Sequence, residues 1–220
     1  ISFNLVSAMD ITLVHGDGDT NKIDLVVIGD GYSAQEIKLY TQKVDEMVNY
    51  MFTSPKSKPY PRYKNFINVW RIDLVSPQSG VDDPNANIWK NTPLNGHKGC
   101  IDWTIQQCQV DWNITHDSIQ VATSTKGFKA DWFLSFLNMN DATAAAHHSS
   151  RGILPVLGTE VHNWHSRQLD IILHEGGHAW HKLADEYHYS EGNTFSGASP
   201  NEVNVSLDSM GDKWSHWLDY

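Results

Sequence analysis

The sequence predicts an α/β fold with a mixed, mostly parallel sheet flanked by helices, and three consecutive segments carry this prediction. Residues 23–28 (IDLVVI) form a nearly continuous apolar run rich in β-branched residues, which is typical of a strand buried on both faces. A helical pattern follows, and residues 66–75 (FINVWRIDLV) then alternate like a second strand. A strand, a helix and a strand in this order favour a parallel crossover.

The helix of this crossover has a recognisable start, periodicity and end. Ser33 and Glu36 stand three residues apart, as in a capping box. Apolar residues then recur at three- and four-residue spacing: Ile37, Tyr40, Val44, Met47, Val48 and Met51. Pro55 follows, and proline cannot continue a helix. We therefore expect a helix over residues 34–52.

Three more segments resemble strands, which gives a sheet of four or five strands: residues 118–122, 132–137 and 153–157. Because Pro155 has no N–H for a ladder, we expect its strand at an edge. Turn residues without a sustained period predict loops in residues 76–99 and 138–152. No linker or repeat divides the chain, so we expect a single catalytic domain over residues 1–220, with a missing C-terminal piece left open.

Composition excludes several classes of protein. The hydrophobic share of 40% is too high for a disordered chain, yet no apolar run reaches the roughly 20 residues of a membrane span. Lys and Arg number 16 against 26 Asp and Glu, and the net charge of −10 would repel phosphate backbones. We therefore expect no nucleic-acid partner and no membrane-spanning segment.

We expect a secreted, extracellular protein, and two features bear on this expectation. Cys100 and Cys108 are close enough to form a disulfide bond in an oxidising compartment, although two free buried thiols are the alternative. Residues 113–115 (NIT) and 204–206 (NVS) match the glycosylation acceptor pattern, so glycans at Asn113 and Asn204 are expected if the source is eukaryotic.

The strongest chemical signal is the run HEGGH at residues 174–178. Ser166 can cap a helix that continues through this run, and that helix places His174 and His178 one turn apart on one face. Both Nε2 atoms can then reach one Zn²⁺ at about 2.0–2.1 Å, as on a zincin-like active-site helix. The ion would lower the pKa of a bound water, and Glu175 would act as the general base for amide hydrolysis. A plain polar stripe on the helix is the alternative.

A catalytic zinc site needs a third protein ligand, and Asp185 is the leading candidate. It follows His178 by seven residues and therefore lies on the same helical face. On an unbroken helix it would lie about 10.5 Å further along the axis, so we expect the helix to turn near residues 182–184. Glu186 and His188 are alternative ligands, and a solvated acidic pair is the remaining interpretation.

Other polar residues are better explained without a role in the site. Tyr187 or Tyr189 could donate a hydrogen bond to an oxyanion, but an ordinary structural tyrosine is favoured for each. Ordinary histidines are also favoured for His147, His148, His162 and His165, and His181 is excluded because it lies roughly 60° off the metal-facing stripe. A β-turn is favoured over a calcium loop for residues 17–21 (DGDTN).

Residues 174–187 (HEGGHAWHKLADEY) resemble the signature of the IgA-specific zinc metallopeptidase family. Further blocks resemble that family in the same order: residues 27–32 (VIGDGY), 68–80 (NVWRIDLVSPQSG) and 204–217, which include Lys213-Trp214. The resemblance implies Zn²⁺ at His174 and His178, Glu175 as general base, and Asp185 as the acidic ligand. Gly176 replaces a bulky apolar residue, and residues 140–152 replace a Gly-rich stretch; both are expected to line the cleft and alter substrate preference.

Two functions follow. The first is a secreted zinc-dependent endopeptidase acting on a protein or peptide substrate. The second is a non-catalytic glycan- or protein-binding module, like a lectin or adhesin, on a metallopeptidase scaffold, which the 9 tryptophans favour. Five of these tryptophans lie in or near strand-like stretches, however, and we expect them to pack in the core: Trp70, Trp89, Trp103, Trp112 and Trp132. Intact His174, Glu175 and His178 argue for the enzyme, because a binding module has no physical need to keep the base.

Overall fold

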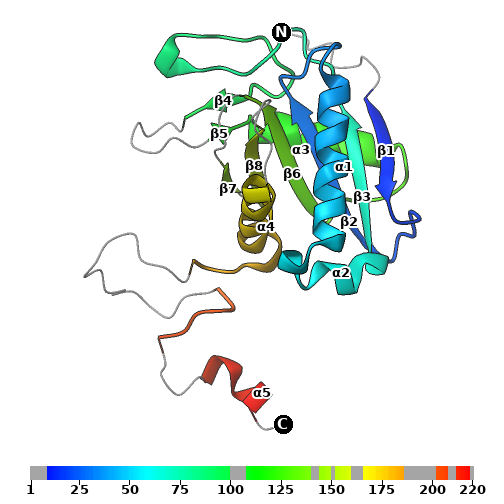
Figure 1. The fold of residues 1–220 in the computed structure, drawn as a ribbon, viewed down its shortest axis with the longest axis vertical. Helices are drawn as coiled ribbons and strands as arrows, with labels where there is room; N and C mark the ends of the chain where they lie inside the picture. Colours follow the sequence, from blue (N-terminus) through cyan, green and yellow to red (C-terminus); the bar gives the residue numbers. More distant parts are fainter. Residues whose placement is uncertain are drawn as a thin grey trace.

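The computed structural model describes residues 9–99, 108–139, 144–149, 152–159, 166–185, 202–207 and 212–218, and these contain a six-stranded sheet (Figure 1). Its order is β1-β3-β2-β6-β8-β7. The strands are β1 (Asp10–His15), β2 (Ile23–Asp30), β3 (Ile67–Asp73), β6 (Trp132–Asn138), β7 (Ala144–Ser149) and β8 (Gly152–Thr159). The inner strands run parallel, and β1 and β7 are antiparallel to their neighbours. A mixed, mostly parallel sheet is thus confirmed.

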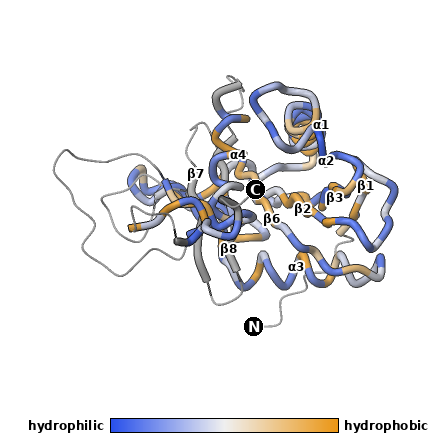
Figure 2. Tube along the Cα trace, turned by 90° about the horizontal axis from the view of Figure 1, so that it is seen from below, coloured by the Kyte–Doolittle hydropathy of each residue, from blue (hydrophilic) through white to orange (hydrophobic). Residues whose placement is uncertain are grey.

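Helices cover both faces of the sheet (Figure 2). The α-helices of the described residues are α1 (Ile37–Thr53), α2 (Tyr60–Tyr63), α3 (Trp112–Ser124), α4 (Ser166–His181) and α5 (Ser215–Leu218); α5 lies away from the sheet in Figure 1. Leu25 and Val27 of β2 pack in one cluster with residues of α1 and α4, whereas Val26 and Ile28 pack in another with residues of α3. All four side chains are fully buried, as the continuous apolar run predicted. None of the helices that the structure describes has the length and apolar character needed to cross a bilayer.

The predicted capping box forms only in part, and α1 begins at Ile37 rather than at residue 34. Glu36 Oε2 accepts a hydrogen bond from the Ser33 N–H at 3.0 Å, which is one half of the box. The Ser33 hydroxyl donates to the same oxygen at 2.6 Å, and the Glu36 N–H donates to the Ser33 carbonyl at 2.9 Å rather than to its side chain. The apolar positions behave as predicted, and Tyr40, Val44, Met47 and Met51 are buried.

The strand predicted over residues 118–122 is wrong, because these residues belong to α3. The Asp111 carboxylate caps this helix by accepting the Ile114 N–H at 3.0 Å. The buried residues recur at helical spacing: Thr115, Ser118, Ile119, Ala122 and Thr123. The short stretch with β-branched residues resembles a strand, but the Asp111 cap and the helical spacing of the buried residues over α3 stabilise a helix instead.

The far side of the sheet also differs from the prediction. The predicted loop over residues 138–152 contains strand β7, and β1 was not predicted at all, so the main sheet has six strands rather than four or five; β4 (His97–Lys98) and β5 (Cys108–Gln109) form a separate two-stranded sheet. Pro155 does not lie at an edge, since its strand β8 lies between β6 and β7. The ladder between β6 and β8 starts at Ser135 and Val156, so Pro155 lies just before it and opposite Ala146 of β7.

The loop over residues 76–99, largely as predicted, is fixed to the carboxyl end of β2 by Asp30. The fully buried Asp30 carboxylate accepts hydrogen bonds from the Thr92 hydroxyl at 2.8 Å, the Leu94 N–H at 3.0 Å and the Gly96 N–H at 2.7 Å. Burial raises the pKa of Asp30 to about 6. Three donors on one carboxylate hold this loop against the sheet.

The tryptophans were expected to pack in the core, and this holds only in part. Trp70 of β3 is 8% exposed and stacks on Phe128. Trp132 of β6 stacks on Trp180 of α4. Trp89 in the 76–99 loop is 65% exposed, so the expectation is wrong for this residue. Trp103 lies outside the described residues.

Candidate metal centre

Helix α4 is fixed to the sheet along one side. Ile172 is buried there, with Leu169 and Leu173 packed against the same cluster. The Trp180 indole stacks on Trp132 at 5.3 Å between ring centroids, and its N–H donates to the Phe133 carbonyl at 3.2 Å. Since residues 174 and 178 are offset by about 200° from positions 172 and 176, the two histidines lie on the opposite side of the helix.

A second set of contacts fixes α4 to α1 and the turn that follows it. The Asp170 carboxylate accepts a hydrogen bond from the Tyr50 hydroxyl and lies 3.2 Å from the Lys56 ammonium. The Tyr50 hydrogen bond is the main cause that lowers the pKa of Asp170. Asp170 stands one helical turn before His174, so these contacts set the rotation of the helix where the candidate site begins.

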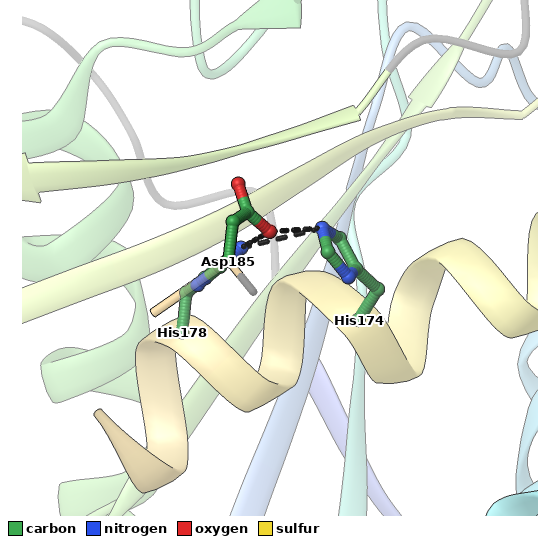
Figure 3. Close-up of side chains that lie close together, drawn as sticks. All are labelled: His174, His178 and Asp185. Atoms are coloured by element: carbon green, nitrogen blue, oxygen red, sulfur yellow. Dashed lines mark hydrogen bonds and ion pairs between the residues drawn. The ribbon is translucent and has the colours of Figure 1, made fainter. Parts of the chain in front are cut away.

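His174, His178 and Asp185 meet at a single point (Figure 3). The two Nε2 atoms lie 3.3 Å apart, and Asp185 Oδ1 lies 3.3 Å from each of them. In a tetrahedral site with bonds of about 2.0–2.1 Å, ligand atoms are separated by about 3.3–3.4 Å. Two imidazole nitrogens and a carboxylate oxygen at these separations fit one zinc ion.

The His178 ring is oriented by a backbone carbonyl. Its Nδ1 lies 2.6 Å from the Leu183 carbonyl oxygen. A carbonyl oxygen only accepts, so Nδ1 carries a hydrogen, and Nε2 is the nitrogen that faces His174 and Asp185. A histidine whose second ring nitrogen donates to a backbone carbonyl has the orientation that is typical of a metal ligand.

The predicted turn near residues 182–184 is confirmed. Helix α4 ends at His181, and Lys182 adopts the left-handed conformation with φ of 54°. The Leu183 N–H then donates to the Gly177 carbonyl at 3.0 Å, so the chain reverses and Asp185 returns toward the two histidines. This reversal removes the axial separation of a continuous helix.

The other residues considered for the site have different surroundings. Glu175 is partly buried on the same helical turn, and its role as base stays a prediction. His181 is not part of the cluster that the described residues form with His174, and its Nε2 lies 2.8 Å from the Tyr60 hydroxyl. Burial lowers the pKa of this histidine. His147 and His148 lie in β7. The remaining candidates lie outside the described residues: His162, His165, Glu186, Tyr187, His188 and Tyr189.

The acidic turn at residues 17–21 is a turn, as predicted, and not a calcium loop. The Asp17 carboxylate accepts the Asp19 N–H at 3.1 Å, and the Lys22 N–H donates to the Asp19 carbonyl at 3.1 Å. The Lys22 ammonium contacts the Asp17 carboxylate at 2.8 Å. The Lys22 ammonium therefore lies beside the Asp17 carboxylate, where a calcium ion would bind.

Gly176 was expected to line the cleft, and this expectation is wrong. Gly176 is buried on the side of α4 that faces the sheet. A Cβ atom at this position would lie 2.5 Å from the Trp180 ring. The glycine therefore makes room for the indole that stacks on Trp132, and it does not serve an approaching substrate.

The two neighbouring glycines of α4 should respond in opposite directions to alanine. We expect Gly176→Ala to lower the free energy of unfolding by about 1–3 kcal/mol, because Trp180 must leave its rotamer. Gly177→Ala is the matched control: its Cβ would lie 3.6 Å from Leu183, and helix propensity should add up to about 1 kcal/mol. Urea unfolding of the metal-free proteins measures both, and equal stabilities would contradict this packing.

The features linked to secretion are only partly within the described residues. Cys100 lies outside them, so the disulfide bond stays a prediction. Asn113 is exposed in the first turn of α3. The side-chain amide of Asn204 donates to the Ala184 carbonyl at 2.9 Å. Sequence reasoning missed this residue as part of the site, because nothing in its local pattern places it beside Asp185.

Comparison with known protein families gives a match over most of the chain. The model of the family described as IgA Peptidase M64 matches residues 11–220, which include His174, His178 and Asp185. No curated protein matches the chain.

Proposed function

The chain belongs to the IgA peptidase M64 family, and from this premise we propose that it is a zinc-dependent endopeptidase that hydrolyses protein or peptide substrates. One observation supports the metal most directly: the three mutual separations of 3.3 Å among His174 Nε2, His178 Nε2 and Asp185 Oδ1. His174 is 44% exposed and Asp185 only 22%, so the group opens to solvent on the His174 side, where a substrate could approach.

In this proposal His174, His178 and Asp185 hold the ion, and Leu183 keeps the His178 ring in the required tautomer. When bound, zinc supplies Lewis-acid activation of water and of the scissile carbonyl. Glu175 takes a proton from the attacking water and delivers it to the leaving amine. The packed face of α4 limits movement of both histidines, so proton transfer occurs in a fixed geometry.

We also propose that the protein acts outside the cell. The spacing of Cys100 and Cys108 supports this location, because a small disulfide loop persists in an oxidising compartment. Of the two acceptor sites, Asn113 has an exposed side chain, whereas the Asn204 amide is engaged by Ala184. A glycan in a eukaryotic source is therefore assigned to Asn113.

Metal removal tests the proposed function. We expect one zinc ion per purified chain, loss of casein hydrolysis after 1,10-phenanthroline treatment, and recovery when zinc is added back. Elemental analysis and a casein assay on the same samples measure this. Hydrolysis by the metal-free protein would exclude the metallopeptidase mechanism. A full complement of zinc without hydrolysis of casein or gelatin would favour the binding-module alternative.

A further inference from the structure

A distant segment holds the residue that precedes Asp185. Asn204 accepts a hydrogen bond from the Ala184 N–H at 2.7 Å and donates to the Ala184 carbonyl at 2.9 Å. The planar amide thus pairs with both backbone groups of one residue, as a neighbouring β-strand would. Next to it, the Val203 N–H donates to the Lys182 carbonyl at 3.3 Å. The segment over residues 202–207 therefore lies beside the turn at the C-terminal end of α4 (Figure 1).

The backbone of this turn is held from two sides. On the α4 side, the Leu183 N–H and carbonyl are bonded to the Gly177 carbonyl and the His178 ring. On the other side, Asn204 satisfies both groups of Ala184. A turn without regular secondary structure needs such partners, because unpaired backbone groups are costly when shielded from water. The position of Asp185 depends on both sides.

Asn204 is itself held on both sides by the segment that follows. The Lys213 ammonium donates to the Glu202 carbonyl at 2.8 Å and to the Val205 carbonyl at 2.6 Å. The Trp214 indole N–H donates to the Val203 carbonyl at 2.8 Å. Lys213 and Trp214 therefore fix the backbone immediately before and after Asn204.

We propose that Asn204 is a positioning residue that sets the Asp185 carboxylate against the two imidazoles, and that Lys213 keeps Asn204 in place; this inference rests on the proposed zinc site. The side-chain amide offers a donor and an acceptor in one plane, as this pairing requires. Aspartate at position 204 would keep the bond from the Ala184 N–H but direct an oxygen at the Ala184 carbonyl. Leucine would lose both bonds at similar size.

The test compares zinc affinity in Asn204→Leu with that in Asn113→Leu, an exposed asparagine on the opposite face of the sheet. We expect the zinc dissociation constant to rise about 10–100-fold in Asn204→Leu, as for other residues that orient a ligand, and to stay unchanged in the control. Competition with a chromophoric chelator measures it. The visible spectrum of the cobalt-substituted protein should change only in the Asn204 variant, since it reports ligand geometry.

Lys213→Met provides a second variant that leaves Asn204 intact. We expect the zinc dissociation constant to rise less in Lys213→Met than in Asn204→Leu. In the double variant, the fold-increase of this constant should be smaller than the product of the two single fold-increases, because both residues act through the same turn. If the wild type binds zinc and both variants bind it equally well with unchanged cobalt spectra, the positioning role is wrong. If the wild type does not bind zinc, the proposed function fails and this inference fails with it.

Discussion

Replacing Glu175 by glutamine should abolish most peptide hydrolysis while zinc stays fully bound. Glutamine keeps the size of the side chain but cannot take a proton from water, and a positioned general base contributes about 10²- to 10⁴-fold to a rate. We expect kcat to fall within that range. Glu175 is not one of the three clustered ligand residues, so metal content should not change. Casein hydrolysis and elemental analysis on one preparation measure both quantities.

Glu46→Gln is the matched control for this variant, because Glu46 is exposed on α1 and undergoes the same chemical change. It should keep wild-type activity and zinc content. A Glu175→Gln protein that retains zinc and loses less than about 10-fold in kcat would show that another group is the base. Loss of zinc from Glu175→Gln would instead assign Glu175 to the structure of the metal site.

The parts of the fold that the sequence predicts correctly are those that depend on local patterns. The apolar run of β2 is buried on both faces, and α1 buries the residues that recur at helical spacing. The strand prediction for residues 118–122 is wrong because five residues are too few to distinguish a strand from a helix. The capping residue of this helix, Asp111, lies outside those five residues. Strand β7 and the inner place of Pro155 depend on pairing partners, which no single segment reveals.

The candidate site divides in the same way. The spacing of His174 and His178 predicts that both imidazoles share a helical face, because the helix itself fixes that geometry. Asp185 could be expected only together with a turn, and the left-handed Lys182 supplies it. Asn204 reaches the site from twenty residues along the chain, through hydrogen bonds that depend on the folded backbone. Nothing in a single sequence distinguishes such an asparagine from an exposed one.

The largest loss of zinc affinity among the carboxylate variants is expected for Asp185→Asn. The variant removes the only carboxylate among the three clustered residues, so an ion held there would lose both a ligand and its charge partner. Residues that merely orient a ligand change affinity about 10–100-fold, and loss of a ligand itself should exceed that range. We therefore expect purified Asp185→Asn to contain little zinc and to show no casein hydrolysis.

The decisive comparison is with Glu186→Gln, which makes the same chemical change one residue further along. If Asp185 is the ligand, Glu186→Gln keeps its zinc, and excess zinc partly restores activity to Asp185→Asn by mass action. Zinc loss from Glu186→Gln with zinc retained in Asp185→Asn would assign the third ligand to Glu186. In that case the Glu186 carboxylate would have to take the place of Asp185 Oδ1, 3.3 Å from both Nε2 atoms. The turn after α4 would then have to contain one more residue.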